Sequence, residues 1–278
     1  MSSSPETPLP SPFLRASRVL REIRNGQLAT LYKINLGDPR VIQIAAAAGA
    51  SALWLCNEHV PNDWANLENQ IRAAALHDTD VLVRVSKGSY SDYIRPLEAG
   101  AAGIIVPHVR SADEARQIVE WTRFGPLGKR PLDGGNADGG YGQVSTADYI
   151  AFSNAERILI LQIESPEAVD NVEEIASVPG FDFLMFGPGD YSHLIGLPGQ
   201  VRASEVEAAR NRVEQAALQN KKWGVAVAVP GSADELLARG YRLVHTGADV
   251  IGLSQAVTAA LAPFATQAAR KSDSLYGR

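Results

Sequence analysis

The stretch that decides the fold is Ile158–Gly199, which reads ILILQIESPEAVDNVEEIASVPGFDFLMFGPGDYSHLIGLPG. It contains an apolar strand that ends at Glu164, an amphipathic helix, and a second apolar strand followed by Asp190. In parallel α/β proteins the active site lies at the carboxyl ends of the strands, so we expect both carboxylates on one face. Two carboxylates there indicate a hard divalent cation such as Mg²⁺ or Mn²⁺, with water and substrate completing its shell.

Apolar strands and helices alternate through the rest of the chain. The expected strands outside the central stretch are residues 28–36, 52–56, 81–85, 103–107, 223–229 and 243–253, with a short candidate at 130–133. Strands that are apolar on both faces and separated by helices indicate repeated βαβ units with a covered parallel sheet. We therefore expect a (β/α)8 TIM barrel, with one of the nine candidates outside the ring. A doubly wound open sheet is the alternative, although no G-x-G-x-x-G follows the first strand.

A barrel of 278 residues is ordinarily one domain. We expect a disordered tail at residues 1–12, a single barrel domain at 13–270, and a C-terminal tail at 271–278. Residues 13–25 have helical spacing and are expected to cap the closed bottom of the barrel. Residues 125–142 are too rich in glycine and proline for a regular element, which predicts a functional loop.

The composition excludes several classes of protein. The net charge is −5, and no stripe of basic residues offers a surface for nucleic acid. A single cysteine, Cys56, excludes an internal disulfide and fits a reducing compartment. The start, MSSSPETPLPSPF, lacks the basic and apolar regions of a signal peptide, and no apolar run approaches the roughly 20 residues of a membrane span. These features predict a cytoplasmic protein without a membrane partner.

Two further side chains end neighbouring strands. His59 stands in a strand-to-helix loop, where a histidine can serve as a general base; a surface histidine in a capping loop is the alternative. Arg84 ends an apolar strand, and an arginine there either pairs with a carboxylate or faces a bound anion. By position Glu98 is an exposed helix residue, whereas His77, His108 and His245 have no evident partner in the sequence.

The central stretch also offers polar groups beside its two carboxylates. Gln162 alternates with Glu164 along its strand, so both side chains should face the same side and offer an amide to a substrate oxygen. Pro188 and Gly189 predict a tight turn, in which the backbone N–H groups of Gly189 and Asp190 can hold a carboxylate.

Five motifs in order carry a family resemblance that covers residues 28–253. They are EHVPND at 58–63, VRV around Arg84, GAAGIIVPHVRSADEA at 100–115, QIES at 162–165 and FGPGDYS at 186–192. Together they resemble the HpcH/HpaI aldolase family, which comprises metal-dependent class II pyruvate aldolases such as 4-hydroxy-2-oxo-heptanedioate aldolase and 2-dehydro-3-deoxyglucarate aldolase.

The resemblance implies a barrel of the pyruvate/phosphoenolpyruvate type and a hexameric assembly. It implies that Glu164 and Asp190 bind Mg²⁺, Mn²⁺ or Co²⁺, and that Gln162 and the amides of Gly189 and Asp190 receive pyruvate. It also implies His59 as the base, Glu98 as the acidic residue that raises its basicity, and Arg84 as the group that stabilises the transition state. The implied reaction is reversible cleavage of a 4-hydroxy-2-oxo acid into pyruvate, or a hydroxypyruvate-like 2-oxo acid, and an aldehyde.

Two departures from the family pattern bear on the reaction. Cys56 and Asn57 stand where the family usually has an aspartate and a glycine before its Glu-His pair, which changes the hydrogen bonding around His59. The loop at residues 128–142 also departs from the family and points to an unusual acceptor aldehyde. The alternatives are an enolate-forming decarboxylase or carbon–carbon bond-forming synthase, and, in another class, a non-catalytic barrel; His59, Arg84, Glu164 and Asp190 together favour an enzyme.

Overall fold

The computed structural model describes residues 13–264, and its centre is a closed barrel of eight parallel strands in sequential order. The strands are β1 (Ala29–Ile34), β2 (Ala52–Cys56), β3 (Asp80–Arg84), β4 (Gly103–Val106), β5 (Ile158–Ile163), β6 (Phe183–Phe186), β7 (Trp223–Ala226) and β8 (Tyr241–Ala248). The predicted TIM barrel is confirmed, and β8 closes it by pairing with β1. The short strand candidate at residues 130–133 is wrong, because that segment forms no regular element.

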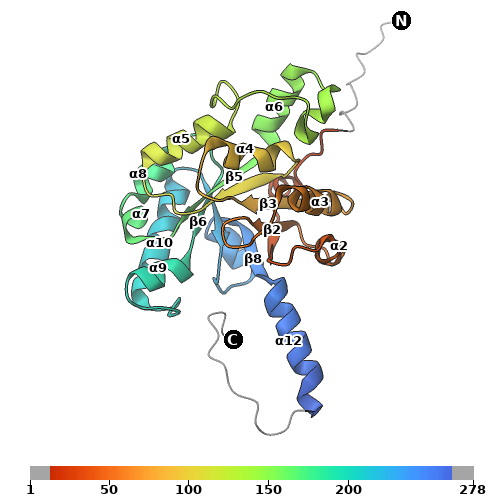
Figure 1. Ribbon diagram of the computed structural model, residues 1–278. Coiled ribbons are helices and arrows are strands. Elements are labelled where there is room, and N and C mark those ends of the chain that lie inside the picture. Colours follow the sequence, from red (N-terminus) through yellow and green to blue (C-terminus); the bar gives the residue numbers. More distant parts are fainter. Residues whose placement is uncertain (1–12, 265–278) are drawn as a thin grey trace, which may run out of the picture.

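Helices surround the barrel, except for α1, which caps its amino end, and α12, which points away from it (Figure 1). They are α1 (Arg18–Arg24), α2 (Pro39–Ala47), α3 (Trp64–Ala75), α4 (Tyr90–Glu98), α5 (Ala112–Thr122), α6 (Thr146–Glu156), α7 (Pro166–Asp170), α8 (Val172–Ser177), α9 (Pro188–Leu194), α10 (Ser204–Gln219), α11 (Ala233–Ala238) and α12 (Asp249–Leu261), with 3₁₀ turns η1 (Ala137–Gly142) and η2 (Ala262–Phe264). The single helix expected after β5 is two short helices, which divide at Asn171. No helix within residues 13–264 is both long and apolar enough to cross a membrane.

Alternation along the strands divides the core into two layers. Inward side chains such as Leu31, Trp54, Leu82 and Ile160 fill the barrel, whereas the residues between them pack outward against the helices. On four of the strands, the next inward-facing residue, two positions further along, is polar. These residues are Lys33 on β1, Cys56 on β2, Arg84 on β3 and Gln162 on β5. The carboxyl end of the barrel is therefore a polar mouth above an apolar interior.

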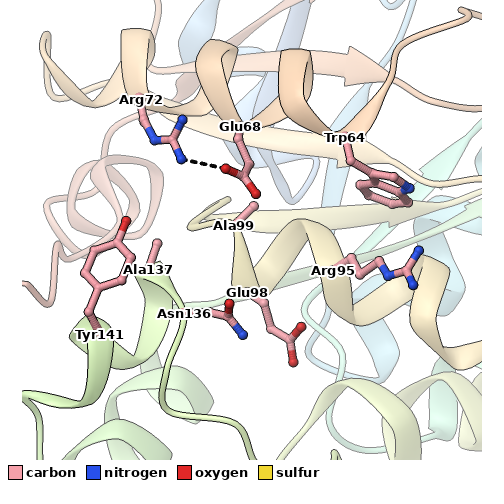
Figure 2. A pocket seen from close by; sticks show the side chains of 9 residues that line it. All are labelled: Trp64, Glu68, Arg72, Arg95, Glu98, Ala99, Asn136, Ala137 and Tyr141. Atoms are coloured by element: carbon pink, nitrogen blue, oxygen red, sulfur yellow. Dashed lines mark hydrogen bonds and ion pairs between the residues drawn. The ribbon is translucent and has the colours of Figure 1, made fainter.

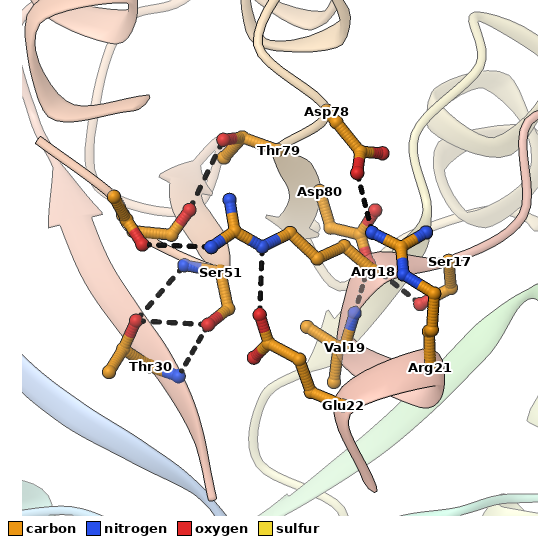
Figure 3. Close-up of polar contacts among 12 residues, drawn as sticks. Ser17, Arg18, Val19, Arg21, Glu22, Thr30, Ser51, Asp78, Thr79 and Asp80 are labelled. Carbon is orange, nitrogen blue, oxygen red and sulfur yellow. Dashed lines mark hydrogen bonds and ion pairs between the residues drawn. The ribbon is translucent and has the colours of Figure 1, made fainter. Parts of the chain in front are cut away.

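The amino end of the barrel is sealed. Val19 and Ile23 of α1 are buried in the same cluster as the inward strand residues, which agrees with the expected cap. Asp80, at the start of β3, accepts hydrogen bonds from the Ser17 hydroxyl at 2.6 Å and from the Val19 N–H at 3.0 Å (Figure 3). These bonds tie the cap to the strand ends, so a ligand reaches the barrel interior from the polar mouth.

The unusual loop at residues 125–142 lies at the amino end, away from the mouth. It follows α5, which ends at that side of the barrel, and a Cβ built on Gly100 before β4 would lie 3.6 Å from Ala137 of the loop. A buried ion pair of 2.7 Å between Arg130 and Asp138 holds the loop in place. The expectation that this loop contacts an acceptor aldehyde is therefore wrong for the chain's own active site.

The C-terminal part departs from the usual barrel pattern. The apolar segment expected at residues 243–253 is divided between β8 and α12, and α12 points away from the barrel instead of returning along it (Figure 1). The expected end of the domain at residue 270 and the expected tails, 1–12 and 271–278, lie outside the described residues.

Candidate active site

Glu164 and Asp190 meet at the mouth of the barrel. Glu164 follows β5, and Asp190 lies in the first turn of α9 after β6, the strand that pairs with β5. The Glu164 side chain is only 1% exposed; its Oε1 accepts the His108 N–H at 2.9 Å, and its Oε2 accepts a hydrogen bond from Gln162 Nε2. Asp190 is exposed and close enough to share a hydrogen bond with Glu164.

The electrostatics of this pair favour a bound cation. The pKa of Glu164 is raised to about 8, chiefly by burial and also by the negative charge of Asp190, whereas the His108 N–H and Arg84 act in the opposite direction. Two carboxylates in such a site ionise together only when a positive charge joins them.

The donor set fits a hard divalent metal ion. Gly187 makes room for it, because a Cβ there would lie 2.7 Å from Glu164 Oε2 and 3.0 Å from Gln162 Nε2. Within residues 13–264 no group of three or more His, Cys, Asp or Glu side chains forms a complete protein cage. Two carboxylates with open positions are the arrangement that Mg²⁺ and Mn²⁺ accept, since water and substrate oxygens fill the remainder.

Arg84 is held rigidly beside this pair. Its side chain is 5% exposed, and Nε lies 3.0 Å from Glu58 Oε2. One terminal nitrogen donates to Cys56 Sγ at 3.1 Å, and the guanidinium lies 4.9 Å from the centre of the Trp54 ring. Of the two expected roles of Arg84, the structure shows the pairing with a carboxylate, which is that of Glu58. Glu58 had a detectable signal, because it follows β2, the neighbour of β3.

Glu58 also contacts two histidines. Its Oε2 lies 3.4 Å from His59 Nε2, and its Oε1 lies 3.3 Å from His108 Nε2. His108 Nδ1 is in turn 3.3 Å from Glu164 Oε1. The view of His108 as a residue without a partner is therefore wrong, since it links Glu58 to Glu164. His108 lies two residues after the end of β4 and has a φ of 52°, an unusual backbone conformation for a residue with a side chain.

Glu98 lies at the other end of the barrel from His59. It is the last residue of α4 and lines a cavity of about 480 Å³ together with Trp64, Arg95 and Tyr141 (Figure 2). Burial raises the pKa of Glu98, and the charge of Arg130 opposes that rise. His59 follows the carboxyl end of β2, so the expected pairing with Glu98 is not made within one chain. The acidic neighbour of His59 in this chain is Glu58.

The expected substrate-binding groups lie next to the carboxylate pair. Gln162 faces the barrel interior, and its Oε1 has no hydrogen-bond partner within residues 13–264. Gly189 and Asp190 lie in the first turn of α9, where the backbone N–H groups of a helix lack acceptors inside that helix. The amides and the two carboxylates thus form one continuous polar surface.

Comparisons with known proteins agree with this arrangement. The family model for HpcH/HpaI aldolase/citrate lyase matches residues 31–256. The chain is 31% identical over 244 residues to a 2-keto-3-deoxy-L-rhamnonate aldolase of Escherichia coli O17:K52:H18 (strain UMN026 / ExPEC), which covers 87% of this chain and 91% of that protein.

Two solved structures are similar along nearly their whole length. An HpcH/HpaI aldolase/citrate lyase family protein from Burkholderia cenocepacia J2315 is 31% identical with a TM-score of 0.80, covering 89% of this chain and 99% of that one. The citrate synthase SbnG is 27% identical with a TM-score of 0.80, covering 90% of this chain and 97% of that one. The chain therefore belongs to the HpcH/HpaI aldolase/citrate lyase family.

Proposed function

We propose that the protein is a metal-dependent aldolase, a carbon–carbon lyase that reversibly cleaves a 4-hydroxy-2-oxo acid into a 2-oxo acid and an aldehyde. The 2-oxo acid is pyruvate or a hydroxypyruvate-like analogue, and the metal is Mg²⁺, Mn²⁺ or Co²⁺. The observation that carries the proposal is the contact between Glu164 and Asp190 beside the buried Arg84. The similarity to a 2-keto-3-deoxy-L-rhamnonate aldolase supports the same class of reaction.

Glu164 and Asp190 are the residues that would hold the metal ion. A divalent cation bound there supplies a Lewis acid that stabilises the enolate of the 2-oxo acid. Gln162 Nε2 and the His108 N–H fix the two oxygens of Glu164, which orients the carboxylate before a ligand arrives. The N–H groups of Gly189 and Asp190 would receive the carboxylate of the substrate.

Arg84 would stabilise the oxyanion that develops at the reacting carbonyl. Glu58, Cys56 and Trp54 fix its guanidinium, so little reorganisation is needed during the reaction. Glu58 does not neutralise the guanidinium fully, because the same carboxylate also contacts two histidines. Part of the positive charge of Arg84 would therefore act on a substrate in the mouth.

His59 would take the proton from the C4 hydroxyl group in the cleavage direction. Its side chain is 59% exposed at the mouth, where a substrate can approach it. Glu58, 3.4 Å from Nε2, stabilises the imidazolium that forms when the histidine accepts a proton. Glu98 has no part in this step within one chain, because it lies at the amino end of the barrel.

The proposal is tested by removing and restoring the metal ion. Chelated protein is expected to lack aldolase activity and to regain it with Mn²⁺, whereas Glu164→Gln should abolish the recovery. Glu167→Gln is the matched control, since Glu167 is a nearby carboxylate that is exposed on α7. Turnover that survives complete chelation in the wild-type protein would refute the metal-dependent mechanism.

His59→Ala separates catalysis from binding. We expect a slower aldol reaction with unchanged pyruvate binding, measured by calorimetry on the Mn²⁺ enzyme. Loss of pyruvate binding in this variant would assign His59 a structural role instead.

A carbon–carbon bond-forming synthase is the second candidate function. The similarity to the citrate synthase SbnG favours it, and the same groups would stabilise the enolate. A panel of 2-oxo acids and carbonyl acceptors, with products identified by mass spectrometry, distinguishes the two. An aldolase forms its product reversibly from an aldehyde, whereas a synthase requires a keto acid acceptor.

We also propose that the protein assembles as a homo-oligomer by exchanging α12. In residues 13–264, β8 is followed by no helix that packs back on the barrel, and a cavity of about 460 Å³ lies at that position, lined by Tyr32, Val41 and Ile44 among others. Ile44 is 70% exposed there. One side of α12 carries an exposed apolar row at the spacing of helix turns, which comprises Val250, Leu253, Val257 and Leu261.

The apolar row of α12 from a second copy would cover this apolar cavity, and exposed apolar surface of this kind marks an interface. Light scattering should give a mass above that of one chain, with a hexamer implied by the family resemblance. Leu253→Glu with Val257→Glu should release monomers, whereas Leu76→Glu, an exposed leucine on another surface, should not. A wild-type monomer at micromolar concentration would contradict the exchange.

A further inference from the structure

The segment that follows β3 is tied to the loops after both neighbouring strands. Ser86 and Lys87 come directly after this strand and before α4. The Ser86 hydroxyl donates to the Asn57 carbonyl, after β2, at 2.7 Å. The Lys87 ammonium donates to the His108 carbonyl, after β4, also at 2.7 Å. Two side chains therefore link three loops of the mouth, and neither of them takes part in the proposed chemistry.

Lys87 is held in place although 39% of its side chain is exposed. Its ammonium lies 2.5 Å from Glu114 Oε1 as well as 2.7 Å from the His108 carbonyl oxygen. Glu114 is fixed in the first turn of α5, where its N–H donates to the Ser111 hydroxyl at 3.2 Å and its Oε2 accepts the Arg110 N–H at 3.0 Å. The carboxylate of Glu114 thus keeps the ammonium next to the carbonyl of His108.

The residue that Lys87 holds has an unfavourable backbone conformation. The φ of His108 is 52°, which lies in the left-handed region that residues with a Cβ adopt rarely. Such a conformation persists where the surrounding contacts fix it. Lys87 binds the carbonyl on one side of the His108 Cα, and the N–H on the other side donates to Glu164 Oε1 at 2.9 Å. Rotation of His108 to the common right-handed conformation would turn this N–H away from Glu164.

The imidazole of His108 restrains a different part of the residue. Its Nδ1 lies 3.3 Å from Glu164 Oε1, and its Nε2 lies 3.3 Å from Glu58 Oε1. These contacts restrain the side-chain torsions, whereas the direction of the N–H depends on the backbone angles. Lys87 is the side chain that acts on the backbone of His108 through its carbonyl.

We propose that Lys87 is a positioning residue for the metal site. By holding the carbonyl of His108, it keeps the His108 N–H directed at Glu164, so that this carboxylate is oriented before a cation binds. Groups that orient a metal ligand raise metal affinity in this way. The inference rests on the proposed metal-dependent function and adds a residue, outside the ligand set, that determines its metal affinity.

The sign of the effect separates positioning from charge. Lys87 is a cation, so its removal would by charge alone strengthen the binding of Mn²⁺. Loss of the support for Glu164 weakens that binding instead. Calorimetric titration of the metal-free protein with Mn²⁺ should therefore give a Kd that is about 3- to 10-fold higher in Lys87→Met, as expected for the loss of one hydrogen bond. Lys87→Arg keeps a donor and should retain a Kd near that of the wild-type protein.

A double-mutant cycle tests whether Lys87 acts through the backbone of His108. Glycine adopts the left-handed conformation without support. In a His108→Gly background, Lys87→Met should therefore change the Kd by less than about twofold. Pyruvate cleavage products need not be measured for this comparison, because Mn²⁺ binding alone is the readout. In the single variant Lys87→Met, the EPR lines of bound Mn²⁺ should broaden, since Glu164 is no longer held in one orientation.

Lys129→Met is the matched control, because Lys129 is an exposed lysine that pairs with Glu120 away from the mouth. Its Kd for Mn²⁺ should equal that of the wild-type protein. An unchanged or lower Kd in Lys87→Met, or an equal rise in Lys87→Arg, would overturn the positioning role. No binding of Mn²⁺ by the wild-type protein would reject the proposed function itself, whereas binding that is insensitive to Lys87→Met rejects the role of Lys87 alone.

Discussion

Acid should destabilise the protein through the protonation of His245. Burial and the charge of Lys33 lower the pKa of this histidine to about 4, whereas an ordinary histidine, as in the unfolded chain, has a pKa near 6.5. Above pH 6.5 the histidine is neutral in both states and its contribution to stability is complete. As the pH falls from 6.5 toward 4 the unfolded chain takes up a proton that the folded protein excludes, so the contribution is lost. The shift of about 2.5 pKa units corresponds to about 3 kcal/mol in the free energy of unfolding.

Urea unfolding of metal-free protein at pH 7.5 and pH 4.5 measures this loss. His245→Gln cannot titrate, so its stability should fall less between the two pH values than that of the wild-type protein, by about 2.5 kcal/mol. His77→Gln, at an exposed position, should show the wild-type pH dependence. Lys33→Met should reduce the effect, because removing the neighbouring charge lets the pKa of His245 rise. Equal pH dependence in His245→Gln and the wild-type protein would refute the reasoning.

Three further changes test the site and the core. Gly187→Ala places a Cβ 2.7 Å from Glu164 Oε2, so we expect at least tenfold weaker Mn²⁺ binding by calorimetry; an unchanged Kd would mean that Glu164 is not a ligand. Arg84→Lys keeps the charge but loses the fixed guanidinium, so kcat should fall about 10²- to 10³-fold, and a wild-type kcat would remove Arg84 from the chemistry. Leu82→Ala opens a cavity in the fully buried barrel interior and should cost about 2 to 5 kcal/mol in urea unfolding, far more than Leu76→Ala on the surface.

The barrel could be predicted because its strands carry a strong local signal. Residues 52–56 and 103–106 are apolar on both faces and are bounded by turn residues, and the structure has strands there. The proximity of Glu164 and Asp190 follows from the same reasoning, since Glu164 comes directly after β5 and Asp190 lies in the first turn of the helix after the adjacent strand β6.

Other features escaped because their signals were not local. Glu58 and His108 each follow a strand, but their importance arises from contacts between loops after different strands, which the sequence alone does not show. The boundary between β8 and α12 was missed because both elements are apolar, and periodicity does not separate a strand from a helix in such a run.

The order of elements along the chain predicts where Glu98 lies in the barrel, whereas its match to the family pattern does not. A residue at the end of a helix that leads into a parallel strand lies at the amino end of the barrel. The same rule places the loop at residues 125–142, which follows a helix, on that end as well. Order along the chain thus locates a residue on one face more reliably than its match to a motif.

The single carboxylate of Glu58 touches Arg84, His59 and His108, all within 3.4 Å. Groups that share one counter-ion are energetically coupled, so replacing any one of them changes the interaction of Glu58 with the other two. Kinetic losses from changing these residues one at a time will accordingly not sum to the loss from changing them together, and double-mutant cycles are the appropriate way to apportion their effects. Glu58 takes part in every such cycle, so one substitution at this position would change the interactions of all three side chains.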